Sequence, residues 1–534
     1  MKQFFANCIV VVIVIVACGK EKPLQAVATT LKIDLGKTTL APSDTAFSVN
    51  VTSNANWEVL SLPGWLAVDQ KTGSGNGRVT FKVNENKDDS IRIFVVTIRA
   101  KDVSRQIRID QMPYLKLKRA IGVPGNSLNK TIDSIRLEFN QPVTMTFIRS
   151  TYNLCLSDIQ YTYKDSNSTV QFSYACGGMG GEYPFTISAR SQFNETLTEN
   201  IKAGFYSKRI NLEGFPVSDF ADYKENSYWL LLKNPHALYK IDMSSFEVLQ
   251  KIPFAREPRM FTISPYNNKL YLAYTLVPEL HIMSKEGAIE KVIPIPTVTG
   301  RPDYYGLYPP PEIHPLHLRF TKSGIGLIAL GARSTEEARL WFIDAADNHR
   351  IWYNDEPEMN FNIFGMKKIH TSYDNDKLLL AYFKYNYFSE LDPATLKFRQ
   401  VYGYNRNSPI GDRYFIVPSP KQDQVYFNQT DVHGILNAQS GDRIPAPSSA
   451  VSLFDFSNSN GSKVVGYTYT NGYNVSSFEV VDITGNKVPL RFDAQGLYYS
   501  LHNTLDGKYT LAVSTNGNGA VTVVQFPDQW FKFE

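Results

Sequence analysis

The residues best suited to ligand chemistry lie in one segment, Thr297 to His317. Three tyrosines in it, Tyr304, Tyr305 and Tyr308, have prolines on both sides. Proline restricts the backbone, so holding such a loop in one conformation costs little entropy. A tyrosine ring adds a flat apolar face with a polar tip. The segment therefore predicts a stiff, exposed aromatic surface of the kind that stacks on a sugar ring.

His314 and His317 end the same segment and are further candidate ligand-binding residues. With Glu312 they have the donor types of a metal site. In a strand, however, positions 314 and 317 point to opposite faces, so no metal site is predicted. No catalytic residue or cofactor is predicted either, because the sequence contains no nucleophile elbow, Walker loop or zinc HExxH pattern.

The N-terminus has the layout of an export signal. A nine-residue apolar run, Ile9 to Ala17, follows Lys2; a membrane-spanning helix needs roughly 20 residues. The ending "IVAC", Ile15 to Cys18, resembles a bacterial lipobox, in which the chain is cut before the cysteine and the thiol is acylated, for example with palmitate. The resemblance implies a lipoprotein anchored through Cys18. An ordinary signal peptide with an incidental cysteine is the alternative.

The other cysteines fit an exported chain. Cys8 lies in the signal, which leaves Cys155 and Cys176 in one β-rich region. In an oxidising compartment they could form a disulfide that closes a loop of about 20 residues, worth roughly 3 kcal/mol on the chain-entropy model. Two buried free thiols are the alternative.

Composition indicates an all-β protein without nucleic-acid partners. The 534 residues carry 55 Lys and Arg against 51 Asp and Glu, a net charge of +4 with no basic stripe. Aromatic residues make up 13%. Short alternating runs separated by Gly, Asn, Asp and Pro occur throughout, which is typical of β-strands.

The segment from Leu31 to Met112 predicts a β-sandwich, and its order of features resembles a BACON domain. The residues that match the pattern of that family are Trp57, Trp65, Gly75, Asn86, Arg92 and Gln111. The resemblance implies an Ig-like module of exported proteins from glycan-harvesting gut bacteria, in which carbohydrate binding was proposed and many members act as spacers. Core packing is favoured over sugar stacking for the two tryptophans.

The rest of the chain predicts a second sandwich and a repeat array. Strand-like runs such as "SIRLEF" and "TVQFSYA" continue to residue 210. Beyond it, an apolar strand ends seven times in a polar residue before a tight turn, at steps of 42 to 60 residues. These polar residues are Asp242, Ser284, Asp344, Asp392, Asn437, Asp482 and Gln525.

Each repeat also has a second turn, about 20 residues before the polar residue. Two hairpin turns in each repeat predict a unit of four strands. Radial stacking into a β-propeller buries the faces of such units. The repeat resembles the propellers of bacterial surface and quinoprotein-like proteins. The predicted domains are a signal peptide (1–17), a linker (18–30), two Ig-like sandwiches, the first BACON-like (31–113 and 114–210), and a propeller (211–534), with seven blades counted and six to eight possible.

The longest repeat step, 60 residues, contains the tyrosine segment Thr297–His317. Insertions on one rim of a repeat array often form its binding face. A loop that packs as a strut against the second sandwich is the alternative.

Two functions fit these features. The first is a lipid-anchored binding protein of the outer membrane that recognises a carbohydrate or a surface protein, at the cell surface or on the periplasmic face. The second is a surface-anchored polysaccharide hydrolase or lyase with scattered carboxylates in the propeller funnel. The missing catalytic patterns favour the first.

The lipobox generates a direct prediction. The Cys18→Ala protein should no longer incorporate a fatty-acid analogue and should leave the membrane fraction, because each buried CH₂ of an acyl chain contributes about 0.8 kcal/mol to membrane binding. Metabolic labelling followed by fractionation measures both. Continued labelling of Cys18→Ala would contradict the lipobox interpretation.

Overall fold

The structure is a computed structural model. It describes residues 27–531, apart from 61, 126–132, 151–155, 157–159, 176, 276, 296–312, 333–336, 354–362, 365, 373, 383–386, 404–414, 419–423, 430–431, 438–442, 446–452, 457–462, 471–474, 483–489, 495–496, 505 and 516–517. Strands make up nearly all the regular structure, and two compact units divide the chain, Met1–Lys116 and Leu117–Glu534.

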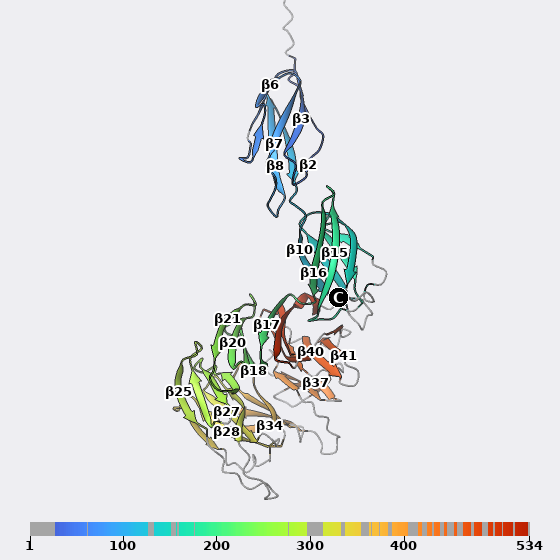
Figure 1. The fold of residues 1–534 in the computed structure, drawn as a ribbon. Helices are drawn as coiled ribbons and strands as arrows, with labels where there is room; N and C mark the ends of the chain where they lie inside the picture. Colours follow the sequence, from blue (N-terminus) through green and yellow to red (C-terminus); the bar gives the residue numbers. More distant parts are fainter. Residues whose placement is uncertain are drawn as a thin grey trace, which may run out of the picture. The chain divides into compact units, whose positions relative to one another are not determined.

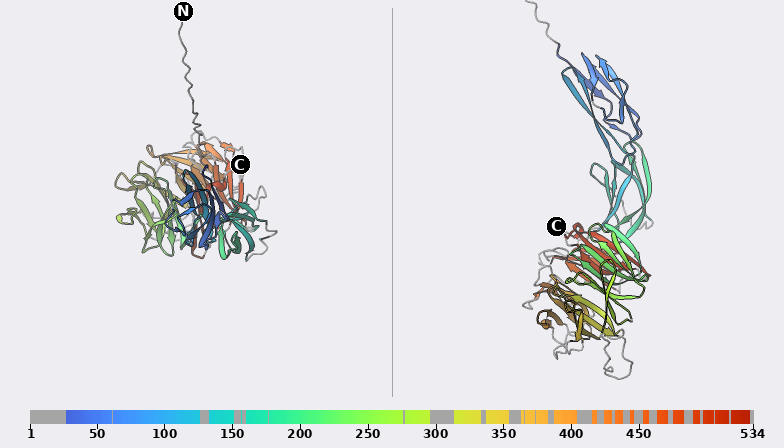
Figure 2. Two further views of the ribbon diagram at one scale, coloured as in Figure 1. Left: turned by 90° about the horizontal axis from the view of Figure 1, so that it is seen from above. Right: turned by 90° about the vertical axis from the view of Figure 1, so that its left-hand side faces the viewer.

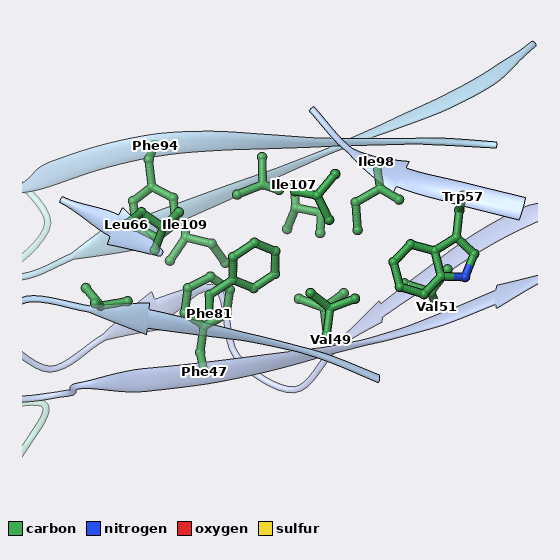
Figure 3. Packing of buried hydrophobic residues seen from close by; sticks show 14 of the residues in the cluster. Phe47, Val49, Val51, Trp57, Leu66, Phe81, Phe94, Ile98, Ile107 and Ile109 are labelled. Atoms are coloured by element: carbon green, nitrogen blue, oxygen red, sulfur yellow. The ribbon is translucent and has the colours of Figure 1, made fainter. Parts of the chain in front are cut away.

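The first unit contains two sheets. One has the order β1 (Leu31–Leu35), β3 (Ala46–Ser53), β7 (Gly77–Val83) and β5 (Leu66–Val68). The other has the order β2 (Thr39–Leu40), β9 (Val103–Gln111), β8 (Arg92–Ala100), β4 (Asn56–Val59) and β6 (Thr72–Ser74). Figure 3 shows Phe47, Phe81 and Phe94 among the apolar side chains buried between them.

The two tryptophans of this unit serve packing, as expected. Trp57 is buried, and its Nε1 donates to the Gly75 carbonyl oxygen at 3.0 Å. A Cβ at Gly73 would lie 2.1 Å from the Trp57 ring, so only glycine allows this approach. Trp65 is half-buried and meets Phe94 edge-on, with ring centroids 4.9 Å apart.

Buried amides hold the loops of the first unit together. The Asn86 Nδ2 donates to the carbonyl oxygens of Ser90 and Gln111, each at 3.1 Å. The Gln111 Nε2 in turn donates to the Asn84 carbonyl oxygen at 3.1 Å. Both side chains are fully buried, so these bonds satisfy polar groups that could not otherwise be buried at low cost.

The second unit begins with one seven-stranded sheet. Its order is β12 (Val143–Ser150), β15 (Glu182–Ser191), β16 (Thr196–Gly204), β10 (Leu117–Val123), β11 (Ser134–Phe139), β14 (Thr169–Ser173) and β13 (Thr162–Lys164). All pairs are antiparallel except β10 with β16, which are parallel and joined at Ile121 and Gly204. That single parallel pair links two antiparallel halves.

Seven antiparallel sheets of four strands follow in the described part of the second unit. In chain order they are β18–β21 (Phe215–Asp222, Ser227–Lys233, Ala237–Asp242, Val248–Pro253), β22–β25 (Pro258–Ile263, Leu270–Tyr274, Glu279–Met283, Ile289–Pro294), β26–β29 (Ile313–Phe320, Ile325–Ala332, Glu337–Asp344, Arg350–Tyr353, with β30, Ile363–Phe364, beside β28), β31–β34 (Met366–Thr371, Leu378–Tyr382, Tyr387–Asp392, Lys397–Gly403), β35–β38 (Phe415–Pro418, Gln424–Gln429, Val432–Asn437, Arg443–Pro445), β39–β42 (Leu453–Phe456, Lys463–Thr470, Val475–Asp482, Leu490–Asp493), and β43–β45 (Leu497–Asn503, Tyr509–Thr515, Ala520–Pro527) with β17 (Lys208–Glu213).

The first strand of each sheet contacts the first strand of the next, and β43 contacts β18, so these inner strands close a ring. The last sheet takes its outer strand from the other end of the array. In it, β17 pairs with β45 from Lys208 opposite Gln525 to Glu213 opposite Ala520. Figures 1 and 2 show this green strand beside the red C-terminal strands. The boundary expected between residues 210 and 211 thus falls inside β17.

Four of the seven polar residues that end the third strands, Asp242, Ser284, Asp344 and Asp392, bind their own turns, as the sequence predicted. The Asp242 Oδ1 accepts from the backbone N–H groups of Ser244 and Ser245 at 2.9 and 2.6 Å. Asp344 and Asp392 accept from the N–H two residues on, each through Oδ1. Gln525 differs: its Nε2 donates to the Met243 carbonyl oxygen of the first sheet at 3.1 Å.

A buried carboxyl lies where the seven-stranded sheet meets the ring. The Met179 N–H donates to the Asp493 carbonyl oxygen. The Tyr498 hydroxyl donates to the Met179 carbonyl oxygen. Close by, the Asp133 Oδ1 accepts from the Gly125 N–H at 2.5 Å. Burial raises the pKa of Asp133 to about 6, and the negative charge of Asp493 adds to the rise.

This carboxyl predicts a pH-dependent stability. The pKa of Asp133 is higher in the folded state than the ordinary value of 3.8. The contribution of Asp133 to the free energy of unfolding is therefore fully present below pH 3.8 and is lost as pH rises through about 6. Asp133→Asn keeps the acceptor for Gly125 and removes the charge. Chemical unfolding should therefore show the variant more stable than wild type at pH 7.5, by on the order of 1 to 2 kcal/mol, and equal at pH 4. A difference that does not change with pH would contradict this prediction.

Candidate functional site

Most residues singled out in the sequence lie outside the described residues, namely Cys18, Cys155, Cys176, Tyr304, Tyr305 and Tyr308. The two histidines lie on β26, the inner strand of its sheet. His317 is half-buried. Predictions for the anchor, the disulfide and the tyrosine loop therefore stay predictions.

The expectation that positions 314 and 317 occupy opposite faces is wrong. A β-bulge between Pro315 and His317 adds one residue, so position 314 pairs with Gly331 and position 317 with Ala329. Gly331 and Ala329 are two residues apart on one strand, so the two backbone positions share a face. Within the described residues, no group of three His, Cys, Asp or Glu side chains is placed to hold a metal ion.

The inner strands follow one pattern, which exposes an exception. Each hairpin turn is closed by one residue pair, Asp222–Ser227 in the first sheet and Ser264–Lys269, Thr321–Ile325, Ser372–Lys377 and Thr504–Tyr509 in four others. In these four sheets, the residue three positions before the closing pair is Phe261, Leu318, Ile369 or Leu501, and all four are buried. The first sheet has Asp219 at this position. The next position along each strand holds Phe220, Thr262, Arg319, His370 and His502. A polar side chain, Asp219, has thus replaced an apolar one on the inner strand of the first sheet. Asp219, Arg319, Tyr499 and His502 form what we call the inner-strand cluster.

Asp219 and His502 form the tightest pair of the cluster. The His502 Nε2 lies 2.6 Å from the Asp219 Oδ2, and since a carboxylate only accepts, the ring nitrogen donates. The Tyr228 hydroxyl donates to the same oxygen at 3.1 Å. The side chains of Asp219 and His502 are 10% and 22% exposed, so they are largely shielded from water but accessible.

Arg319 brings a positive charge to the same cluster from two sheets away. Its guanidinium lies 5.5 Å from the centre of the Phe220 ring, a cation–π contact between β26 and β18. Burial lowers the pKa of Arg319, an effect that the negative charge of Asp219 opposes. Tyr499 on β43 is half-buried, and its hydroxyl donates to the Val217 carbonyl oxygen at 2.9 Å. Burial raises the pKa of Tyr499.

The cluster therefore offers an acceptor, an imidazole, a cation and aromatic faces within one ring of strands. Such a set can bind a polar ligand, and an imidazole oriented by a carboxylate can also move a proton. Sequence reasoning missed it because the repeat was aligned on the third strands. Aligning the first strands would have shown Asp219 in an apolar position.

A second, shallower feature lies on the turns between two sheets. A depression of about 630 Å³ is lined by Lys322, Ser323, Asp376, Lys377, Asp392 and Pro393. Lys322 forms a salt bridge with Asp376 at 2.5 Å, and Lys377 with Glu390 at 2.9 Å. Its two cations are thus already neutralised by neighbours, which makes it a weaker candidate than the inner-strand cluster.

No family model matches the sequence, and no curated protein matches it. Among solved structures, hydrazine synthase of Kuenenia stuttgartiensis is 13% identical over 59% of this chain and 96% of that chain, with a TM-score of 0.41. The β-propeller domain of Cps50 (Swd1) from Myceliophteria thermophila is 11% identical over 60% and 98%, with a TM-score of 0.43. A GH5 xyloglucanase of Bacteroides ovatus in complex with a heptasaccharide is 19% identical over 16% and 19%, with a TM-score of 0.15.

The protein is thus all-β, and the solved structures that it resembles include a β-propeller domain. At these scores the similarities carry no argument about ligand or activity. Among the residues described, no helix is long and apolar enough to cross a membrane.

Proposed function

We propose that the protein is a lipid-anchored binding protein of the outer membrane in which a seven-bladed β-propeller recognises a glycan, either a polysaccharide or the glycan of a glycoprotein. In this proposal the lipid on Cys18 holds the chain at the membrane. The BACON-like domain and the second β-domain act as spacers, and the propeller faces the cell surface, with the periplasmic face as the alternative.

One observation carries the binding role: Asp219 occupies an inner-strand position that is apolar in the four other sheets compared. An aspartate in a position otherwise filled by Phe, Leu or Ile gives up buried apolar area. Bonds to His502 and Tyr228 contribute to offsetting this loss. A ligand site explains why an aspartate stands in place of an apolar residue. Binding a ligand requires polar groups, whereas packing the inner strands of the ring does not.

A second function, a surface-anchored polysaccharide hydrolase or lyase, is favoured by the Asp219–His502 pair. An imidazole whose nitrogen donates to a carboxylate at 2.6 Å is oriented as a general base or acid requires. A glycan-array screen of residues 27–534, with reducing ends measured for every glycan bound, separates the two. Binding without release supports the binding protein, release supports the enzyme, and binding to no glycan contradicts both.

The tyrosine segment is the second candidate binding surface. If Tyr304, Tyr305 and Tyr308 stack on the ligand, their simultaneous change to alanine should abolish measurable binding to a glycan found on the array. Losing one stacked aromatic commonly costs roughly 5- to 150-fold in affinity. The melting temperature should stay within a few degrees. Unchanged binding with a sharply lower melting temperature would instead identify the segment as a strut and direct attention to the inner-strand cluster.

A further inference from the structure

Arg319 is a half-buried cation, and no carboxylate among the described residues forms a salt bridge with it. The negative charge of Asp219 acts on it only from a greater distance. Within the part of the chain that the structure describes, Arg319 makes one hydrogen bond, from Nη1 to the Leu318 carbonyl oxygen at 3.0 Å, and no salt bridge within 4.0 Å. A guanidinium has five N–H donors in a rigid plane. Most of these donors therefore have no acceptor among the described residues and are available to a ligand.

The nearest carboxylate, Asp219, is already engaged. It accepts from the His502 Nε2 at 2.6 Å and from the Tyr228 hydroxyl at 3.1 Å. Tyr228 is fully buried and its hydroxyl also lies 3.3 Å from the Ser500 Oγ, which holds this arrangement in place. Asp219 is thus oriented toward its donors on β19 and β43 and not toward Arg319.

Two other arginines of the ring, unlike Arg319, form salt bridges with carboxylates. Arg399 lies 3.3 Å from Glu390, and the exposed Arg350 on the outer strand β29 lies 3.1 Å from Asp347. Arg319 alone among these three sits on an inner strand, flanked by the Phe220 ring and by a polar pair. A flat cation beside an aromatic ring and an imidazole matches an acidic sugar: the guanidinium takes the anion, and His502 can bind a ring hydroxyl.

We propose that Arg319 binds the anionic group of an acidic glycan, a uronate carboxylate or a sulfate ester, within the inner-strand cluster. This inference rests on the proposed glycan-binding function and adds the chemical class of the ligand. Both anions present two neighbouring oxygens that a guanidinium can bind through two parallel hydrogen bonds. A neutral glycan leaves the guanidinium unpaired and should bind less tightly.

The test uses full-length protein in detergent and isothermal titration calorimetry. The probes are oligogalacturonate, the same oligosaccharide after reduction of its carboxyl groups, and a sulfated galactan oligosaccharide. We expect at least one acidic probe to bind, and carboxyl reduction to abolish tight binding if the uronate is the ligand. Arg319→Gln should weaken binding of the acidic probe roughly 10- to 150-fold. Arg319→Lys should recover only part of it, because an ammonium cannot form the paired bonds.

Two controls separate binding from folding. Arg350→Gln removes an exposed arginine of the same sheet and should leave affinity unchanged. The melting temperature of Arg319→Gln should equal or exceed that of wild type, because the change removes an unpaired, half-buried charge. Equal affinity of Arg319→Gln and wild type, an equal loss in Arg350→Gln, or a sharply lower melting temperature of Arg319→Gln would overturn the inference.

The outcomes also separate this inference from the proposed function. Binding of the reduced oligosaccharide as tightly as the acidic one leaves glycan binding intact and overturns the role of Arg319. A second experiment tests whether the anion site exists even if no glycan binds: free glucuronate and free sulfate are each titrated, and the melting temperature is measured. If no oligosaccharide binds but these anions raise the melting temperature of wild type and not of Arg319→Gln, the anion site stands and the glycan function falls. If neither probe class acts, both proposals fall.

Discussion

The pairing of β17 with β45 is the constraint on which the rest of the second unit depends. The chain enters the array with β17, builds six complete sheets, and returns to place β43, β44 and β45 beside that first strand. A sheet with an unpaired edge exposes backbone donors and acceptors, and stacked sheets in an open array expose two end faces. Closing the ring with a strand from the other end covers the edge of β45 and removes the two end faces, so that only short outer edges such as that of β17 are left.

Closure also creates the inner-strand cluster. Asp219 lies in the first sheet and His502 in the last, 283 residues apart in sequence, and they are neighbours only because β18 and β43 meet when the ring closes. Tyr228 and Ser500 meet across the same junction. Gln525 of the last sheet reaches Met243 of the first. Structural closure and the candidate site therefore share one junction, so a change that opens the ring should also dismantle the site.

Features that depend on local geometry were predictable from the sequence, and those that depend on closure were not. The Asp242 and Asp344 turns are fixed by bonds spanning two or three residues, so their register could be predicted. Trp57 packing was predicted because a large aromatic side chain in a small β-sandwich is more often part of the core than of a binding surface. The bulge in β26 reversed the expectation for His314 and His317, since one inserted residue moves every later position to the other face. Asp219 and Arg319 were missed because nothing local to β18 or β26 indicates that these strands meet.

Native-state hydrogen exchange followed by mass spectrometry tests the closed ring most directly. Strand β17, Lys208–Glu213, is the edge of the last sheet, so within the sheet the amides that are hydrogen-bonded are those that point toward β45. If the ring is closed in this way, these amides should exchange as slowly as those of β44 and β45, because the three strands open as one cooperative unit. Exchange of β17 at the rate of an unstructured peptide, while β44 and β45 stay protected, would contradict the account.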